Sequence, residues 1–236
     1  MRVIIRCAGN GDRWGNYRGV PKHLVKLAGE PVLHRMVRLI GEIAPDADVK
    51  VVVNDMTDRR YLVPGSTRTR NVWTSEHGDI DKIASSRHLF DRSDRTVILW
   101  GDTWWSRPAL TDVLTADLDG WHAWLRLGPH DIGGEIFAFA WTAATNAEIS
   151  DACDKAIAAY QAGELDTAGY KGRRELRGGW ALYRALCGVA WDDAGKHGFA
   201  TVVDDWTEDM DTQRDWDEWC LRWAQTDPEL RQQYIA

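Results

Sequence analysis

Two glycines, an arginine and a lysine follow a short apolar run near the start of the chain. After residues 2–7 (RVIIRC) come Ala8, Gly9, Asn10, Gly11 and, one residue later, Arg13; Pro21-Lys22 comes after a gap. Glycines let backbone N–H groups approach phosphate oxygens without a Cβ in the way. Arg13 can bind two phosphate oxygens at once, and Lys22 adds a point charge. This order of residues predicts a loop that binds the phosphates of a nucleotide.

Carboxylates follow a second apolar run and recur near the end of the chain. Asp102 comes just after residues 96–100 (TVILW) and a glycine, and residues 204–211 (DDWTEDMD) form an acidic tract. Magnesium prefers a few hard oxygen ligands and keeps waters and phosphates as the others. One aspartate at a strand end and a second from elsewhere therefore suffice for a metal site.

Each of these features also has an ordinary structural interpretation. Gly9 and Gly11 can form a tight turn, and Lys22 can be a solvated charge. Asp102 can end a strand, and an acid of the late tract can stabilise the start of a helix. The motif argument favours the functional interpretation, because the strand, the glycines and the basic residues occur in one fixed order.

Strand-like and helix-like segments alternate along the chain. The strand-like segments are 2–7, 49–53, 71–73 (weak), 96–100, 121–127, 135–141 and 199–203, and the helix-like ones are 31–43, 79–90, 108–116, 145–162, 179–186 and 212–224. Such alternation predicts an α/β fold with a mostly parallel sheet and helices on both faces. Ligands bind beyond the carboxyl ends of the strands in such sheets, which is where the candidate residues lie.

Composition sets the broad class of the protein. The 236 residues predict one domain, and 44% hydrophobic residues are enough for a core. A net charge of -7 argues against a broadly basic nucleic-acid binder. The sequence predicts no membrane span and no signal peptide. Four cysteines without a CxxC pair predict reduced thiols in a cytoplasmic protein. Fourteen tryptophans exceed what a core needs, so a surplus on the surface would suit stacking on sugars or bases.

Residues 3–40 resemble the opening of sugar-1-phosphate nucleotidyltransferases and molybdopterin guanylyltransferase-like proteins, with the pattern AAGxGxR…PK.L…G.P. Cys7 stands where that pattern has an alanine. The resemblance implies the nucleotide-diphospho-sugar transferase (GT-A) fold, a three-layer, Rossmann-like arrangement. It also implies a loop that wraps a nucleoside triphosphate, with Arg13 and Lys22 on the phosphates. Residues 1–117 would then be the nucleotide-binding half and residues 118–236 the acceptor-binding half of the domain 1–236.

The resemblance extends to further site residues. The stretch GDTWW is similar to the family's "lvlyGDvPl" segment, which implies that Asp102 is a ligand of Mg²⁺ or Mn²⁺, and DMDTQRDW is similar to a late "xDTxxDL" motif, which implies Asp211 as the second ligand. Together with Arg13 and Lys22 these form the expected catalytic set. The family's base-reading segment corresponds to the region of Glu76 and His77, the weakest part of the match.

Two transferase functions remain open. The first is nucleotidyl transfer from a nucleoside triphosphate to a sugar 1-phosphate or similar acceptor, with release of pyrophosphate. On the acceptor side, Glu135 would bind hydroxyls by family resemblance. Residues 170–180, with Arg173, Arg174 and Trp180, form a basic segment with aromatics for a phosphate or a nucleic-acid backbone.

The second function is glycosyl transfer from a UDP-sugar to 5-hydroxymethylpyrimidine in DNA, because the whole chain is also similar to phage TET-associated glycosyltransferases. On that hypothesis Trp104 and Trp105 would meet DNA and a flipped base, together with the basic segment. The tryptophan surplus favours it, while the acidic net charge and the lack of a DxD triplet argue against it. A phage origin and an oligomer stay open, as do the base and the sugar.

Overall fold

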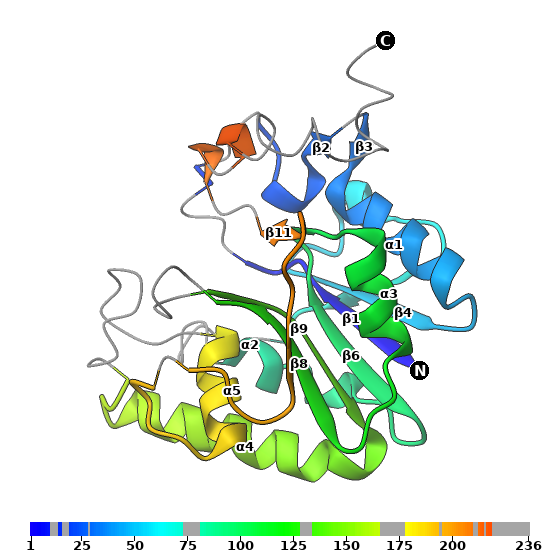
Figure 1. Ribbon diagram of the computed structural model, residues 1–236. Helices are drawn as coiled ribbons and strands as arrows, with labels where there is room; N and C mark the ends of the chain where they lie inside the picture. Colours follow the sequence, from blue (N-terminus) through cyan, green and yellow to red (C-terminus); the bar gives the residue numbers. More distant parts are fainter. Residues whose placement is uncertain are drawn as a thin grey trace. The chain divides into compact units, whose positions relative to one another are not determined.

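A computed structural model describes residues 1–9, 14–15, 19–27, 29–72, 81–127, 134–165, 178–193, 195–209, 212–214 and 216–218. Its main strands are β1 (Arg2–Arg6), β4 (Asp48–Val53), β5 (Thr67–Arg70), β6 (Arg95–Trp100), β8 (Trp121–Arg126), β9 (Glu135–Thr142) and β10 (Ala200–Val202). These strands form one sheet in the order β10-β8-β9-β6-β1-β4-β5 (Figure 1). The sheet is mostly parallel, which confirms the predicted α/β class.

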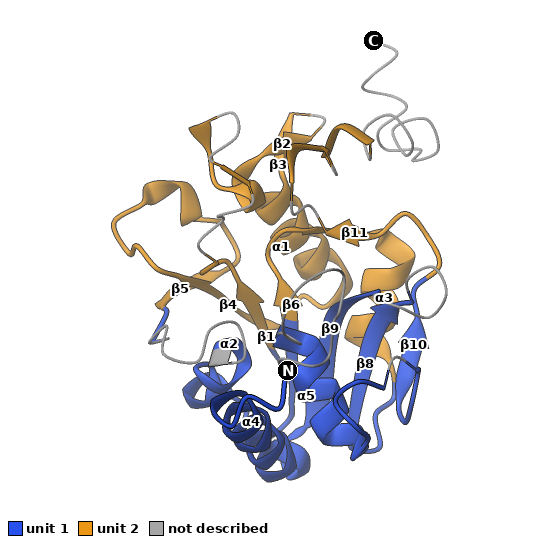
Figure 2. Cartoon of the chain, turned by 90° about the vertical axis from the view of Figure 1, so that its left-hand side faces the viewer, with its two compact units in different colours: residues 1–2, 71–98, 117–203 blue, residues 3–70, 99–116, 204–236 orange. Residues whose placement is uncertain are grey.

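The chain divides into two compact units (Figure 2). Unit 1 comprises residues 1–2, 71–98 and 117–203, and unit 2 comprises residues 3–70, 99–116 and 204–236. Each unit is built from separate stretches of the sequence. The predicted halves, residues 1–117 and 118–236, therefore do not coincide with the two compact units. Their roles in nucleotide and acceptor binding stay predictions.

Unit 2 contains the short elements around the first strand. Its helices are α1 (Val32–Ile43) and α3 (Arg107–Thr115), and its 3-10 turns are η2 (Lys22–Leu24) and η3 (Arg59–Tyr61). The strand β2 (Lys26–Leu27) forms an antiparallel pair with β3 (Glu30–Pro31), which follows it closely in the sequence. The strand β7 (Thr103–Trp104) forms another with β11 (Glu208–Asp209), which comes from the far end of the chain. The helix α3 begins at Ser106, whose hydroxyl accepts from the backbone N–H of Ala109 at 3.0 Å. Such a cap satisfies one of the donors that a helix start leaves open.

Unit 1 contains a mixed part of the sheet and three helices. The strand β8 pairs antiparallel with β9, with a register shift between Trp124 and Leu125, and pairs parallel with β10. The helices are α2 (Asp81–Ala84), α4 (Asn146–Gln161) and α5 (Gly178–Cys187), and α4 packs against the other two. The remaining 3-10 turns are η5 (Arg87–Leu89) and η7 (Ala143–Thr145). The side chains of β9 from Ile136 to Trp141 are all buried, as expected for a strand covered on both faces.

Most of the described tryptophans lie in the interior. The buried ones are Trp14, Trp104, Trp105, Trp121, Trp124, Trp141, Trp180 and Trp216. An aromatic side chain removes a large apolar area from water when it is buried, which is the dominant favourable contribution to folding. The tryptophan surplus is thus largely used in the two cores and is not evidence for a stacking surface.

Two predicted elements differ from the observed ones. The weak strand expected at 71–73 is instead β5 at Thr67–Arg70, which has no apolar side chain and pairs only along its β4 side. An apolar pattern cannot reveal such an edge strand. The helix expected at 79–90 is only α2 followed by η5. The hydroxyls of Ser85 and Ser86 donate to the Lys82 carbonyl at 3.0 and 3.4 Å, a contact that competes with helical hydrogen bonding.

No helix among the described residues combines the length and the apolar character needed to cross a bilayer.

The glycine before β9 gives a test of the sheet in unit 1. A Cβ on Gly134 would lie 1.2 Å from the Arg126 carbonyl oxygen, so Gly134→Ala must push the start of β9 away from the end of β8. We expect a loss of unfolding free energy of roughly 3 kcal/mol or more, measured by denaturant unfolding. In the control Gly41→Ala, the new methyl on α1 meets nothing within 4 Å. That change should be neutral or add up to about 1 kcal/mol. Equal stability of the two variants would contradict the packing described here.

Candidate functional site

Lys22 and Asp102 form an ion pair in unit 2. The Lys22 ammonium contacts the Asp102 carboxylate, and the two side chains are only 16% and 17% exposed. Lys22 opens η2 and Asp102 follows β6, so the two residues come from segments far apart in the sequence. The fold thus brings together two of the residues that the sequence assigns to phosphate and metal binding.

A close approach at Gly101 places Asp102 beside the end of β1. The Gly101 N–H donates to the Arg6 carbonyl at 2.9 Å. A Cβ at this glycine would lie 2.3 Å from the Cys7 sulfur and 3.0 Å from the Arg6 oxygen. Only glycine therefore lets the segment that carries Asp102 pass so near the end of β1.

The start of the glycine-rich loop is anchored on one side and open on the other. Ala8 is buried, and its carbonyl accepts from the side-chain amide of Asn54 at 3.1 Å. Gly9 is exposed, and an added Cβ there would meet no atom of the described residues within 4 Å. The space in front of Gly9 is thus available to a ligand, as the prediction of a phosphate-binding backbone requires.

Two neighbouring groups are uncharged near neutral pH. Burial lowers the pKa of His23 to about 4, although the negative charge of Asp102 opposes the shift. Burial, reinforced by Asp102, raises the pKa of the Cys7 thiol well above its usual value. The Lys22–Asp102 ion pair therefore lies beside two uncharged side chains.

His23 is held by a tyrosine from a different loop. Its Nε2 shares a hydrogen bond with the Tyr61 hydroxyl, and the two ring centroids are 5.1 Å apart. Both side chains are buried, and Tyr61 belongs to η3. Burial also raises the pKa of Tyr61, so its hydroxyl stays protonated.

The acidic tract near the C-terminus runs beside the segment that follows Asp102. In the antiparallel pair of β7 and β11, Asp209 lies opposite Thr103. Asp205 has a structural role, because its carboxylate accepts from the Ser106 hydroxyl and from the Thr207 N–H, the latter at 2.7 Å. Asp205 thereby ties the segment before β11 to Ser106 at the start of α3. Asp211 lies outside the described residues.

A buried arginine fastens these segments to α1. Arg35 is 3% exposed and donates from Nη1 to the Trp105 carbonyl at 2.7 Å. Its guanidinium carbon lies 4.1 Å from the ring centroid of Trp104 and 5.7 Å from that of Trp206. A cation above an aromatic face is attracted by the ring quadrupole. Arg35 thus joins α1 to the end of β7, at Trp104 and Trp105, and to Trp206, which precedes β11.

The predicted contact of Trp104 and Trp105 with a flipped base is wrong. The two side chains are 2% and 1% exposed, and they lie in the core of unit 2. Trp104 packs in one cluster with Trp14, Val25 and Trp216. A tryptophan at this depth stabilises the fold and cannot stack on a nucleobase.

Within the described residues, no group of three or more histidine, cysteine, aspartate or glutamate side chains could hold a metal ion. Asp102 offers a single carboxylate. Magnesium needs only one or two carboxylates when substrate phosphates supply its other ligands. Asp102 therefore fits an ion that binds together with the phosphates of a nucleotide.

On the acceptor side, the structure describes Glu135 and Trp180, which both lie in unit 1. Glu135 begins β9 with a partly exposed side chain, opposite Arg126 on β8. Trp180 is 5% exposed, and its indole N–H donates to the Gly134 carbonyl at 3.2 Å. Trp180 therefore supports the core of unit 1, and its contact with an acceptor stays a prediction. The predicted site residues outside the described part are Asn10, Gly11, Arg13, Glu76, His77, Arg173, Arg174 and Asp211.

Several residues of the site escaped the sequence analysis. His23 and Tyr61 lie 38 positions apart, and Asn54 lies 46 positions from Ala8, so no spacing rule joins them. A signal for Asn54 exists in the sequence, because it directly follows the apolar run 49–53. Asp102 was found in a similar place, one glycine after the run 96–100. The signal for Gly101 was its place just before Asp102.

Comparisons with known proteins identify the fold. The structure is similar to a UDP-glucose pyrophosphorylase from Acinetobacter baumanii, with a TM-score of 0.59 and 12% identity over 99% of this chain and 96% of that one. It is also similar to a nucleoside-diphosphate-sugar pyrophosphorylase from Vibrio cholerae (TM-score 0.57, 12% identity, 94% and 100% covered). A third is the CTP:phosphocholine cytidylyltransferase from Streptococcus pneumoniae (TM-score 0.55, 14% identity, 92% and 96% covered). The chain has the fold of these nucleotidyltransferases.

The fold implied by the sequence resemblance is thereby confirmed across almost the whole chain. No family model matches the sequence, and no curated protein matches it either. At identities of 12–14% the likeness concerns the fold, and the chemistry must be argued from the site.

The approach at Gly101 can be tested by adding one methyl group. Gly101→Ala should cost about 2–4 kcal/mol of unfolding free energy, because the Cβ overlaps the Cys7 sulfur. In the double variant Cys7→Ala/Gly101→Ala the sulfur is gone, and we expect part of the stability to return. Denaturant unfolding of both variants and of Cys7→Ala measures this. A Gly101→Ala protein as stable as the parent would refute the close approach.

Proposed function

We propose that this chain is a magnesium-dependent nucleotidyltransferase. It transfers a nucleotidyl group from a nucleoside triphosphate to a sugar 1-phosphate or a similar phosphorylated acceptor, and it releases pyrophosphate. The observation that carries the proposal is the Lys22–Asp102 pair beside the end of β1, where the open Gly9 begins the glycine-rich loop. The fold shared with three nucleotidyltransferases supports it.

Lys22 and the loop would bind the triphosphate. Lys22 and Asp102 neutralise each other at a partly buried position. A triphosphate brings several negative charges and competes with Asp102 for the ammonium. The backbone from Gly9 to Gly11 and the guanidinium of Arg13 would complete this phosphate site, as the sequence predicts.

Asp102 and Asp211 would hold Mg²⁺ or Mn²⁺, which supplies charge stabilisation at the phosphates when it is bound. The pairing of β7 with β11 supports this choice of aspartates, because it brings Asp209, two residues before Asp211, opposite the residue that follows Asp102. Asp205 has a structural role instead, since its carboxylate accepts from the Ser106 hydroxyl and the Thr207 N–H.

The reaction needs little acid–base chemistry from the protein. An oxygen of the acceptor phosphate attacks the α-phosphorus, and the bond to the leaving pyrophosphate breaks. Arg13 and Lys22 would offset the charge that develops on the pyrophosphate. Histidine 23 is not a candidate base, because its buried ring is committed to Tyr61. The proposed contacts to the base remain Glu76 and His77. The proposed contacts to the acceptor remain Glu135, Arg173 and Arg174.

Glycosyl transfer from a UDP-sugar to modified DNA is the alternative, and it loses its main argument. The tryptophan surplus that favoured it is used largely in the cores, and Trp104 and Trp105 are buried. No observation on the described residues favours DNA as the acceptor.

A substrate panel combined with Asp102→Asn tests the proposed reaction. ATP, CTP, GTP, UTP and dTTP are each incubated with Mg²⁺ and several sugar 1-phosphates, and pyrophosphate is measured. At least one pair should react, and Asp102→Asn should lower that rate by roughly 100-fold or more. Asp112→Asn, an exposed carboxylate on α3, is the control and should keep the parental rate. Transfer of sugar from a UDP-sugar to hydroxymethylated DNA, without pyrophosphate release in the panel, would select the alternative.

A methyl group on Gly9 tests whether phosphates occupy the open space. Because nothing lies within 4 Å of the added Cβ, Gly9→Ala should unfold at nearly the parental temperature. If phosphates approach the backbone here, the variant should bind the reactive nucleoside triphosphate at least about tenfold more weakly, since the methyl excludes them. Calorimetric titration measures the affinity. Unchanged affinity in a stable Gly9→Ala protein would place the phosphates elsewhere.

A further inference from the structure

The connection from β4 to β5 contacts the predicted phosphate site at two separate points. At its start, the Asn54 amide donates to the carbonyl of Ala8, just before the first glycine of the loop. Further along, Tyr61 of η3 shares a hydrogen bond with His23, the residue next to Lys22. Residues 54–61, here called the brace, thus hold the glycine-rich loop at one end and the lysine turn at the other.

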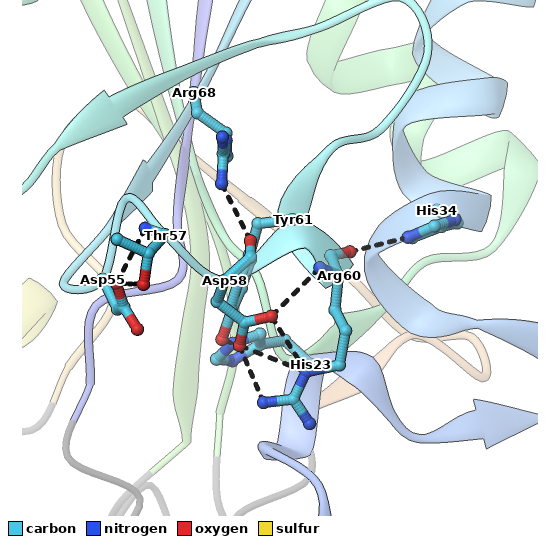
Figure 3. Close-up of polar contacts among 8 residues, drawn as sticks. All are labelled: His23, His34, Asp55, Thr57, Asp58, Arg60, Tyr61 and Arg68. Carbon is cyan, nitrogen blue, oxygen red and sulfur yellow. Dashed lines mark hydrogen bonds and ion pairs between the residues drawn. The ribbon is translucent and has the colours of Figure 1, made fainter.

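The brace is itself fixed by short local contacts (Figure 3). Asp55 accepts from the N–H of Thr57 at 2.7 Å and from its hydroxyl at 2.6 Å. Asp58 accepts from the backbone N–H of Arg60 at 3.0 Å and pairs with its guanidinium at 2.7 Å. The hydrogen bond from Arg60 keeps the pKa of the Asp58 carboxyl below its usual range. These contacts leave the segment little freedom between its two anchor points.

Two neighbouring elements hold the brace from outside. Arg68 on β5 donates to the Asp58 carbonyl at 2.8 Å. The Nε2 of His34 on α1 lies 3.2 Å from the Arg60 carbonyl. The brace is therefore attached to a strand and a helix as well as to the phosphate site (Figure 3), and it can transmit their rigidity to Lys22 and Ala8.

We propose that Asn54 and Tyr61 are positioning residues that hold the glycine-rich loop and Lys22 at the spacing needed to bind a triphosphate. They touch no reacting atom and act through Ala8 and His23. This inference rests on the proposed nucleotide site. Neither the fold likeness nor the sequence resemblance assigns a role to this connection.

The His23–Tyr61 contact explains how the lysine turn keeps its place. His23 is 5% exposed and lies within η2, so its ring fixes the backbone that carries Lys22. A buried polar group that loses its partner is costly and tends to move towards water. Without the Tyr61 hydroxyl, we expect the turn to shift and Lys22 to leave its position beside Asp102.

Triphosphate binding by single variants tests the brace. Tyr61→Phe and Asn54→Ala are compared with the control Ser66→Ala, which removes a hydroxyl contact with the Val63 carbonyl in the same connection but outside the brace. The probes are the reactive nucleoside triphosphate and inorganic tripolyphosphate, each with Mg²⁺. Both test variants should bind both probes about five- to tenfold more weakly, and Ser66→Ala should match the parent. Because tripolyphosphate has no base, a parallel loss locates the effect at the phosphates.

The kinetic constants and a rescue variant separate positioning from plain stability. Both test variants should show a raised KM for the triphosphate, and Tyr61→Phe should also lower kcat, because the displaced Lys22 would no longer offset the charge that develops on the leaving pyrophosphate. His23→Gln keeps a side-chain amide for Tyr61 and should retain affinity, whereas His23→Leu should lose it. Binding is measured well below each melting temperature, so a purely structural loss would lower that temperature and leave the affinity unchanged.

The outcomes also distinguish the brace from the proposed function. If the parent protein binds neither probe, the nucleotide site itself is refuted. If the parent binds both probes and the folded Tyr61→Phe and Asn54→Ala variants bind them equally well, the brace is refuted while the proposed function stands.

Discussion

The ion pair between Lys22 and Asp102 is the interaction on which the candidate site depends. Two charges at a partly buried position are costly to desolvate, and each neutralises the other. The pair exists because Gly101 lets the chain pass close to Cys7 and Arg6. Such a pair also poises the site for an anion, since a triphosphate can replace the carboxylate on the lysine. The neighbouring His23 and Cys7 stay neutral because both side chains are buried.

The surroundings of this pair are rigid for reasons that have little to do with charge. Buried aromatic rings fill unit 2, and Arg35 joins α1 to the backbone at Trp105. The β7–β11 pair and the bonds of Asp205 fix the acidic tract beside the segment after Asp102. The aromatic content that first pointed to a nucleic-acid surface therefore has a different physical role: it holds short, irregular segments that could not form a stable core with small side chains.

The likeness to nucleotidyltransferases at 12–14% identity shows which features of the sequence such a fold requires. A pattern of apolar strands, glycines at strand ends and amphipathic helices can be met by many sequences, so the architecture persists while most residues change. Substrate choice depends on a few side chains on loops.

The sequence alone determined the α/β class and most of the strands and helices, because apolar periodicity is a local signal. It also singled out Lys22 and Asp102 for a nucleotide site, and the fold brings these two side chains together as an ion pair. It could not reveal β5, which has no apolar residue, or the burial of Trp104 and Trp105, because exposure depends on which segments pack together. It also could not join Asn54 to Ala8 or Tyr61 to His23. Those contacts unite residues far apart in the chain, and only tertiary packing decides which of them meet.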